Sequence, residues 1–169
     1  MTSSNMKGDG YGKKVRDLMT PLEKVPWVDL GDDMGDTIHL LYNFRQDCRS
    51  CNSAVVSSDG KVVGLLTMRS ILEALEPEAF NVNQWSVPVF WSGLWTEQVK
   101  KLNSKKVSDI FVPIKMVGVH ADGCLMRAVY CFNKTKMPAL AVLDGPNVIG
   151  VLEVPVIYEE LLRNGQQNI

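Results

Sequence analysis

Cys48 and Cys51 are the residues whose types and spacing most clearly suit chemistry. Their C-x-x-C arrangement fits a tetrahedral metal ion or a redox-active thiol pair. The other two cysteines, Cys124 and Cys131, stand seven positions apart, and the sequence does not indicate that the four thiols converge. Four cysteines in 169 residues are too few for a disulfide scaffold. We therefore expect reduced thiols, and a metal or labile disulfide at Cys48 and Cys51 is the alternative.

The sequence carries no catalytic motif of a common class. It has no Gly-x-Ser-x-Gly elbow, His-Glu-x-x-His pair or P-loop, and Gly8-Asp9-Gly10 lacks the strand and helix of a dinucleotide motif. Asp32, Asp33 and Asp36 cluster in one polar stretch, but a cation site would need more oxygen ligands than this run guarantees. The sequence therefore predicts a solvated loop at these residues and a protein that is not an enzyme and requires no cofactor.

The composition is that of an ordinary globular protein. Hydrophobic residues make up 46% of the chain, and 18 Lys and Arg stand against 19 Asp and Glu without any basic run. This balance argues against nucleic acid or an anionic membrane as a partner. Residues 1–12 are polar and hold no apolar signal segment, and no apolar run is long enough to span a bilayer. We expect residues 1–12 to be disordered and the protein to be cytoplasmic.

The two halves of the sequence repeat each other. The halves align at a shift of 92 positions near the start and of 86 positions further on. The paired residues include Val15 with Val107, Pro21 with Pro113, Gly64 with Gly150, and Leu66 with Leu152. The first copy therefore has six more residues, which we place mainly in the polar stretch 30–35 as an enlarged loop. The predicted units are 13–76 and 105–163, with a connecting segment at 77–104 and a C-terminal tail at 164–169.

The residue pattern of the first copy predicts the element order β-α-β-β-α. Strands are expected at 25–28, 54–56 and 62–66, the last two joined by a turn in which Gly60 can adopt positive φ. The expected helix caps are Asp36 and Thr67. The residues expected on the inner faces of the two helices are Ile38, Leu41 and Tyr42, and then Ile71, Leu72 and Leu75.

The second copy predicts the same order. Strands are expected at 117–120, 139–143 and 148–152. Asp122 is expected to cap a helix that buries Leu125, Ala128, Val129 and Phe132, and a last helix with Pro155 near its start is expected to end at Leu162. A unit of about 60 residues buries little surface alone, so two units should pack face to face. The predicted fold class is α/β (α+β), with pseudo-twofold symmetry between the units.

The connecting segment is rich in tryptophan. Trp85, Trp91 and Trp95 lie in it, so it does not have the composition of a flexible linker. The rings either pack on the back of the two units or cover a groove, or they form a dimer contact, since aromatic residues are enriched at interfaces.

Two stretches of the first copy resemble a known family. Val-Arg-Asp-Leu-Met-Thr-Pro at 15–21 and Asp-Gly-Lys-Val-Val-Gly-Leu-Leu-Thr-Met-Arg-Ser-Ile-Leu at 59–72 resemble the cystathionine-β-synthase (CBS) domain. The repeat makes the whole chain similar to a CBS pair, or Bateman module. This resemblance implies binding of adenine nucleotides or related adenosyl ligands in clefts between the units, a disc-shaped homodimer, and signalling of ligand occupancy to a partner.

The resemblance also implies a ligand motif, Gly-x-x-Thr/Ser-x-x-Asp, whose hydroxyl lies near phosphate and whose Asp binds the ribose diol. In the first copy these positions are Gly64, Thr67 and Ser70, so Ser replaces the ribose Asp. The loss of a charge-assisted contact of about 1.5–3 kcal/mol predicts weakened binding. In the second copy Glu153 takes the place of the hydroxyl, and its charge would repel a phosphate.

The remaining site residues are those that the resemblance implies, with ordinary strand packing as the alternative for each. For the first site they are Thr20, Pro21, Val25, Ala54 and Val55, with Arg69 placed to neutralise a phosphate. For the second, weaker site they are Val112, Pro113, Val117, Pro138, Ala139 and Leu140.

These observations favour one function and leave two alternatives. The favoured function is a stand-alone regulatory CBS pair that binds AMP, ADP, ATP or S-adenosylmethionine mainly through its first unit and signals to a protein effector. The second is a structural dimerisation or docking module with decayed ligand sites. The third is a metal or redox module at Cys48 and Cys51.

Overall fold

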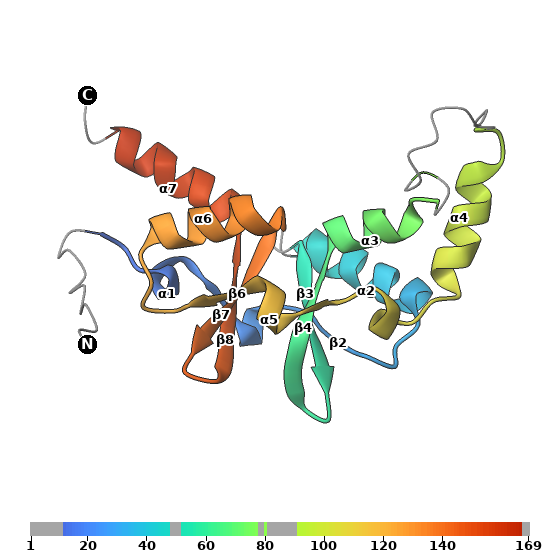
Figure 1. Ribbon diagram of the computed structural model, residues 1–169, viewed down its shortest axis with the longest axis horizontal. Coiled ribbons are helices and arrows are strands. Elements are labelled where there is room, and N and C mark those ends of the chain that lie inside the picture. Colours follow the sequence, from blue (N-terminus) through green and yellow to red (C-terminus); the bar gives the residue numbers. More distant parts are fainter. Residues whose placement is uncertain (1–11, 48–51, 78–79, 81–90, 167–169) are drawn as a thin grey trace, which may run out of the picture.

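The computed structural model describes residues 12–47, 52–77, 80 and 91–166, and these residues form two four-stranded sheets (Figure 1). One sheet has the order β2-β3-β4-β5, with strands at Trp27–Asp29, Ser53–Ser58, Lys61–Thr67 and Val112–Pro113. The other has the order β1-β8-β7-β6, with strands at Thr20–Pro21, Asn147–Glu153, Ala139–Asp144 and Gly118–His120. The predicted fold class, two β-α-β-β-α units in tandem, is confirmed.

Helices connect and flank these strands. The α-helices are α1 (Val15–Leu18), α2 (Met34–Asp47), α3 (Met68–Leu75), α4 (Leu94–Asn103), α5 (Ile114–Val117), α6 (Leu125–Thr135) and α7 (Val154–Gln166). Two short 3-10 helices lie at Leu22–Lys24 and Val107–Asp109. No helix in the described ranges is both long enough and apolar enough to cross a membrane.

The central hairpins of the two units match in detail. In the β3–β4 hairpin, the turn residues Asp59 and Gly60 have φ of 50° and 74°, the left-handed region that glycine adopts without strain. The ladder of this hairpin shifts register after Val56, and that of the β7–β8 hairpin shifts after Val142. These two valines are 86 positions apart, so the repeat in the sequence is also a repeat of strand irregularities.

Each unit receives its outer strand from the opening segment of the other. Strand β1 lies in the opening segment of the first unit but pairs with β8 of the second, where Pro21 lies opposite Gly150. Strand β5 lies in the opening segment of the second unit but pairs with β4 of the first, where Pro113 lies opposite Gly64. Backbone bonds extend the exchange, because Val15 N–H donates to the Gly123 carbonyl at 3.0 Å, and Val107 N–H to the Asp32 carbonyl at 3.0 Å. The two units are therefore interlocked.

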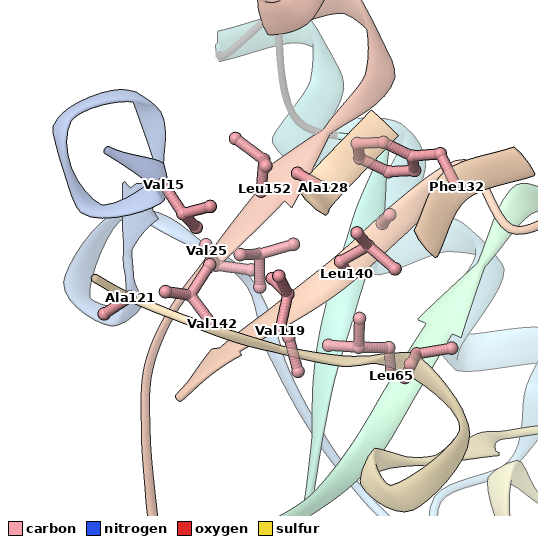
Figure 2. Packing of buried hydrophobic residues seen from close by; sticks show 14 of the residues in the cluster. Val15, Val25, Leu65, Val119, Ala121, Ala128, Phe132, Leu140, Val142 and Leu152 are labelled. Carbon is pink, nitrogen blue, oxygen red and sulfur yellow. The ribbon is translucent and has the colours of Figure 1, made fainter. Parts of the chain in front are cut away.

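The larger apolar core also crosses the boundary between the units. Figure 2 shows Val25 and Leu65 of the first copy beside Val119, Leu140 and other buried residues of the second. A second core lies against the sheet of the first unit and also takes residues from the connecting segment and the second copy; it contains Val28, Met34, Ala54, Val56, Leu66, Leu102, Val107 and Ile110. Burial of these side chains is the main driving force for the association of the sheets.

Four predictions about the helices are wrong. Helix α2 begins at Met34, so Asp36 lies in its first turn and does not cap it. Helix α6 has Cys124 as its N-cap, and Asp122 instead binds Arg16. Tyr42 is 63% exposed and Leu72 is 62% exposed, although both were expected to face inward. Each lies one residue beyond a correctly placed inner residue, where the helix surface turns away from the sheet.

The extra residues of the first copy do not lie in the stretch 30–35. Strands β2 and β6 begin at Trp27 and Gly118, and helices α2 and α6 at Met34 and Leu125, a separation of 91 positions in both cases. The separation falls to 86 only at β3 and β7. The first copy is thus longer by a further turn of α2 and by the connection that follows it.

Helix α4 of the connecting segment packs against α2 and α3 at the edge of the first unit (Figure 1). Its Leu102 enters the core of that unit. Trp91 and Trp95 are each 71% exposed, so the prediction that they pack on the units is wrong for these two rings. Trp91 contacts Phe80, with ring centroids 5.6 Å apart. Trp85 lies outside the described residues, and a dimer contact of the rings stays a prediction.

Candidate functional site

Thr67 and Ser70 lie where β4 passes into α3. Thr67 is the last residue of the strand and the N-cap of the helix, as the sequence predicted. Ser70 N–H donates to Thr67 Oγ1 at 3.1 Å, and Thr67 N–H donates to Ser70 Oγ at 3.1 Å. This reciprocal capping satisfies two backbone donors of the helix start.

Both hydroxyls are buried and engaged in this arrangement. Ser70 Oγ–H donates to the Thr67 carbonyl at 2.9 Å, and Thr67 Oγ1 lies 3.4 Å from Ser70 Oγ. A phosphate or ribose that used these hydroxyls would have to replace bonds that now stabilise the helix. Thr67 and Ser70 can orient the start of α3. They offer a ligand fewer free hydrogen-bonding groups than the hydroxyl and carboxylate that the family resemblance implies.

Arg69 lies between these residues and faces outward. Its guanidinium donates from Nε to the Glu73 carboxylate at 2.7 Å, one helical turn further on. Both side chains are more than half exposed. An exposed pair of this kind contributes less than about 1 kcal/mol, so Arg69 can exchange Glu73 for an anionic ligand at little cost.

Arg69 also lines a groove of about 590 Å³ whose other lining residues come from the second copy. The first copy contributes Arg69, and the second contributes Met126, Val129, Phe132, Asn133, Lys136, Met137, Pro138, Val154, Ile157, Tyr158 and Leu161. Helices α3, α6 and α7, which supply most of these residues, lie on one side of the two sheets in Figure 1. The volume and the mostly apolar walls with a few polar groups are typical of small-molecule sites.

Two of the site residues expected from the sequence line this groove, and the others lie elsewhere. Arg69 and Pro138 come from the two separate sites of the expectation and meet here. The apolar members are buried in the cores, namely Val25, Ala54, Val55, Val117, Ala139 and Leu140. The half-buried members lie in the exchanged strands, namely Thr20, Pro21, Val112 and Pro113.

Gly64 serves the exchange of strands. A Cβ atom at this position would meet the Phe111 ring at 2.5 Å and overlap the Val112 carbonyl oxygen. Glycine is therefore required at this point by the close approach of β5, and not by a ligand.

Sequence reasoning missed Lys136 and Asn133, the other polar residues of the groove. Lys136 is the C-cap of α6 and has φ of 58°, an uncommon conformation for a residue other than glycine. A lysine directly after a helix and two residues before a proline is a signal for this turn. This turn signal does not by itself indicate a ligand. Only the fold, which brings Lys136 and Arg69 to the same groove, gives it that meaning.

Glu153 occupies the position in the second copy that Thr67 occupies in the first, and it is only 3% exposed. Its carboxylate accepts hydrogen bonds from Asn52 N–H at 2.9 Å and from Ser53 Oγ–H at 2.5 Å. Burial is the largest influence and raises the pKa of Glu153, and the hydrogen bonds from Ser53 and Asn52 oppose it. The side chain thus joins the end of β8 to the start of β3.

No group of three or more His, Cys, Asp or Glu in the described part of the chain could hold a metal ion. Cys48 and Cys51 lie outside the described residues, so their role stays a prediction; Cys124 and Cys131 are free thiols.

In the acidic stretch, Asp32 accepts a hydrogen bond from Asp29 N–H at 2.8 Å, and Asp33 pairs with Lys106 at 2.8 Å. The Asp32 carboxylate therefore stabilises the loop, and the Asp33 carboxylate binds the loop to the opening segment of the second copy.

Comparison with known proteins supports the fold. Residues 15–77 match the family model of the CBS domain. No curated protein matches the chain in sequence. Among solved structures, the CBS-pair protein CBSX2 from Arabidopsis thaliana is 23% identical with a TM-score of 0.66, covering 92% of this chain and 99% of that one.

Two further solved structures have the same fold. CBSX2 in complex with AMP is 20% identical with a TM-score of 0.63, covering 91% of this chain and 99% of that one. A CBS-domain-containing protein from Bacillus anthracis is 17% identical with a TM-score of 0.63, covering 89% and 94%.

Proposed function

Since residues 15–77 match the family model of the CBS domain and the chain has the fold of a CBS pair, we propose that this protein is a stand-alone regulatory module. It binds an adenine nucleotide or a related adenosyl ligand at the groove between its two copies, and it signals occupancy to a protein effector. It is not an enzyme in this proposal. The similar protein CBSX2 has been crystallised with AMP, which makes AMP the first ligand to test.

The groove carries the proposal because its lining combines apolar side chains with positively charged ones. Apolar side chains such as Val129, Ile157 and Tyr158 offer a surface for an adenine ring. Arg69 from the first copy and Lys136 from the second supply positive charge for a phosphate. A ligand that contacts both would bridge the copies, and its binding would therefore alter how they pack.

Calorimetric titration with AMP, ADP, ATP and S-adenosylmethionine tests this function. We expect saturable binding of at least one of them at millimolar concentration or below. Arg69→Ala should weaken a phosphorylated ligand by roughly 10- to 100-fold, the value of a charge-assisted hydrogen bond of about 1.5–3 kcal/mol.

Arg163→Ala is the matched control for this substitution. Arg163 is an exposed arginine that also pairs with a glutamate one turn away, but it does not line the groove. It should leave the affinity unchanged. Equal losses in the two variants, or no binding of any of the four ligands, would show that the groove is not a nucleotide site.

A second candidate function is a dimerisation or docking module, and a specific observation favours it. Large apolar side chains are exposed on α6 and α7, including Met126, Tyr158, Leu161 and Leu162. This is the composition of an interface more than of a solvated helix surface. In this case light scattering should report a homodimer that no adenosyl ligand affects, and Leu162→Glu should dissociate it. A homodimer that also binds AMP would favour the regulatory function.

A further inference from the structure

Asn52 and Ser53, at the start of strand β3, donate hydrogen bonds from uncharged groups to one carboxylate. Asn52 N–H donates to Glu153 Oε1 at 2.9 Å and lies 3.2 Å from Oε2. Asn52 Nδ2 donates to Oε2 at 3.4 Å, and Ser53 Oγ–H donates to Oε1 at 2.5 Å. The acceptor comes from the other copy, 100 residues along the chain from Ser53. Among the described residues, the groups that donate to this buried carboxylate are uncharged.

The repeat shows that this contact runs in one direction only. Glu153 and Thr67 are equivalent, since each pairs in its hairpin with the first residue of the preceding strand, Ala139 and Ser53 respectively. The Thr67 side chain instead bonds within its own copy, where it accepts a hydrogen bond from Ser70 N–H at the start of α3. The residue equivalent to Asn52 is Pro138, which has no N–H to donate. The donors are therefore a property of β3 and are absent at the start of β7.

The donor set suits an oxyanion in general. A backbone N–H, an amide and a hydroxyl that converge on one point are what a carboxylate accepts when it is shielded from water. Burial raises the pKa of Glu153, and the hydrogen bonds from Ser53 and Asn52 oppose this effect, so the donors favour the ionised carboxylate. An unfilled set of such donors would be unfavourable, because buried donors without acceptors cost about 1–3 kcal/mol each.

We propose that Asn52 and Ser53 form an oxyanion-binding site for small carboxylates, and that the chain fills it with its own Glu153. Glu153 is then an internal ligand that occupies these donors in place of an external anion. This inference goes beyond nucleotide binding at the groove and does not depend on it.

Chemical rescue of the full-length Glu153→Ala variant tests the proposal. The substitution empties the site, and sodium formate should refill it. At about ten times its dissociation constant, formate should raise the thermal unfolding midpoint by roughly 3–5 °C over sodium chloride of equal ionic strength. The wild type, whose site is filled, should show no difference between the two salts.

Two matched variants separate this site from a general salt effect. The double variant Glu153→Ala with Ser53→Ala lacks a donor and should lose most of the response to formate. Glu97→Ala removes an exposed, ion-paired carboxylate and should behave as the wild type. Equal formate responses in Glu97→Ala and Glu153→Ala would overturn the proposal.

A Glu153→Ala protein that does not fold in sodium chloride still gives a decisive result. Its circular dichroism should then recover with increasing formate concentration, because binding to the folded state alone shifts the equilibrium. No recovery at any formate concentration would also overturn the proposal. Loss of AMP binding by Arg69→Ala is a separate measurement, so failure of the nucleotide proposal is distinguishable from failure of this one.

Discussion

Positions 67 and 153 end equivalent strands, yet their side chains contact different copies. A threonine at the first position is short enough to bond its own helix, where Ser70 N–H donates to its hydroxyl. A glutamate at the second position has two more rotatable bonds, and its carboxylate reaches the start of β3. The identity of one residue thus decides whether the strand end stabilises a helix or joins two units.

The buried carboxylate of Glu153 should leave a signature in the pH dependence of stability. Its pKa is raised from 4.5 mainly by burial, so the folded state binds the proton more tightly than the unfolded chain does. The stability that this group contributes is present below pH 4.5 and lost as the pH rises through the raised pKa. We therefore predict that the free energy of unfolding of the wild type, relative to that of Glu153→Gln, falls as the pH rises through this window.

Urea unfolding followed by tryptophan fluorescence at several pH values measures this difference. The comparison with Glu153→Gln is needed because other groups act in the opposite sense. Hydrogen bonds from Arg16 and Lys14 lower the pKa of Asp122, and one from Lys13 lowers the pKa of Glu160, so their contributions are lost as the pH falls. These contributions are common to both proteins and cancel. A difference that is constant or rises with pH would contradict the prediction.

Among the elements, the exchanged strands place the strictest demand on sequence. Gly64 and Gly150 lie where β5 and β1 pair with the central hairpins, and a Cβ atom at Gly150 would meet the Thr20 carbonyl oxygen at 2.6 Å. We predict that Gly64→Ala and Gly150→Ala each lower the free energy of unfolding by roughly 1–3 kcal/mol, the range for overpacking of a core.

Gly31→Ala is the control for both substitutions, because a Cβ atom there meets only Asp29 Oδ1, at an ordinary 3.6 Å. It should change the free energy of unfolding by less than about 0.5 kcal/mol in urea titrations. Equal stability of all three variants would show that the strand exchange does not require glycine at positions 64 and 150.

Elements whose signal is local could be predicted from the sequence. The two hairpins follow from apolar runs on either side of Asp59-Gly60 and Asp144-Gly145, and the cap of α3 follows from Thr67. The start of α2 was misplaced because Asp36 is a good cap in isolation, whereas tertiary bonds decide the boundary. Met34 N–H donates to the Lys105 carbonyl of the arriving second copy at 3.0 Å, which no local pattern contains.

On the scale of the whole molecule, the candidate groove could not be predicted because it combines the two copies. The sequence expectation assigned Arg69 and Pro138 to separate sites, and only the packing of α3 beside the turn at Lys136 brings them together. The exchange of β1 and β5 was equally hidden, since each strand has two residues and no periodicity. The repeat predicted two units, but not that each completes the other.

This interlocking predicts that the two units unfold as one. Val15 belongs to the first copy, but it is buried in the core with Val119, Ala121 and Val142 of the second (Figure 2). Val15→Ala should therefore destabilise the first unit as much as the second, by about 2 kcal/mol for lost burial and a residual cavity. Tryptophan fluorescence reports the first unit and its connecting segment, since all four tryptophans lie between positions 27 and 95.

Far-UV circular dichroism reports both units, so the two signals test the coupling directly. In urea, the two transitions should coincide in the wild type and should move together to lower urea in Val15→Ala. Val107→Ala makes the reverse test, because Val107 belongs to the second copy and is buried in the core of the first unit. It should also move both signals together. If Val15→Ala shifted the circular dichroism signal and left the tryptophan transition in place, the units would be independent and a ligand in one could not alter the other through the shared core.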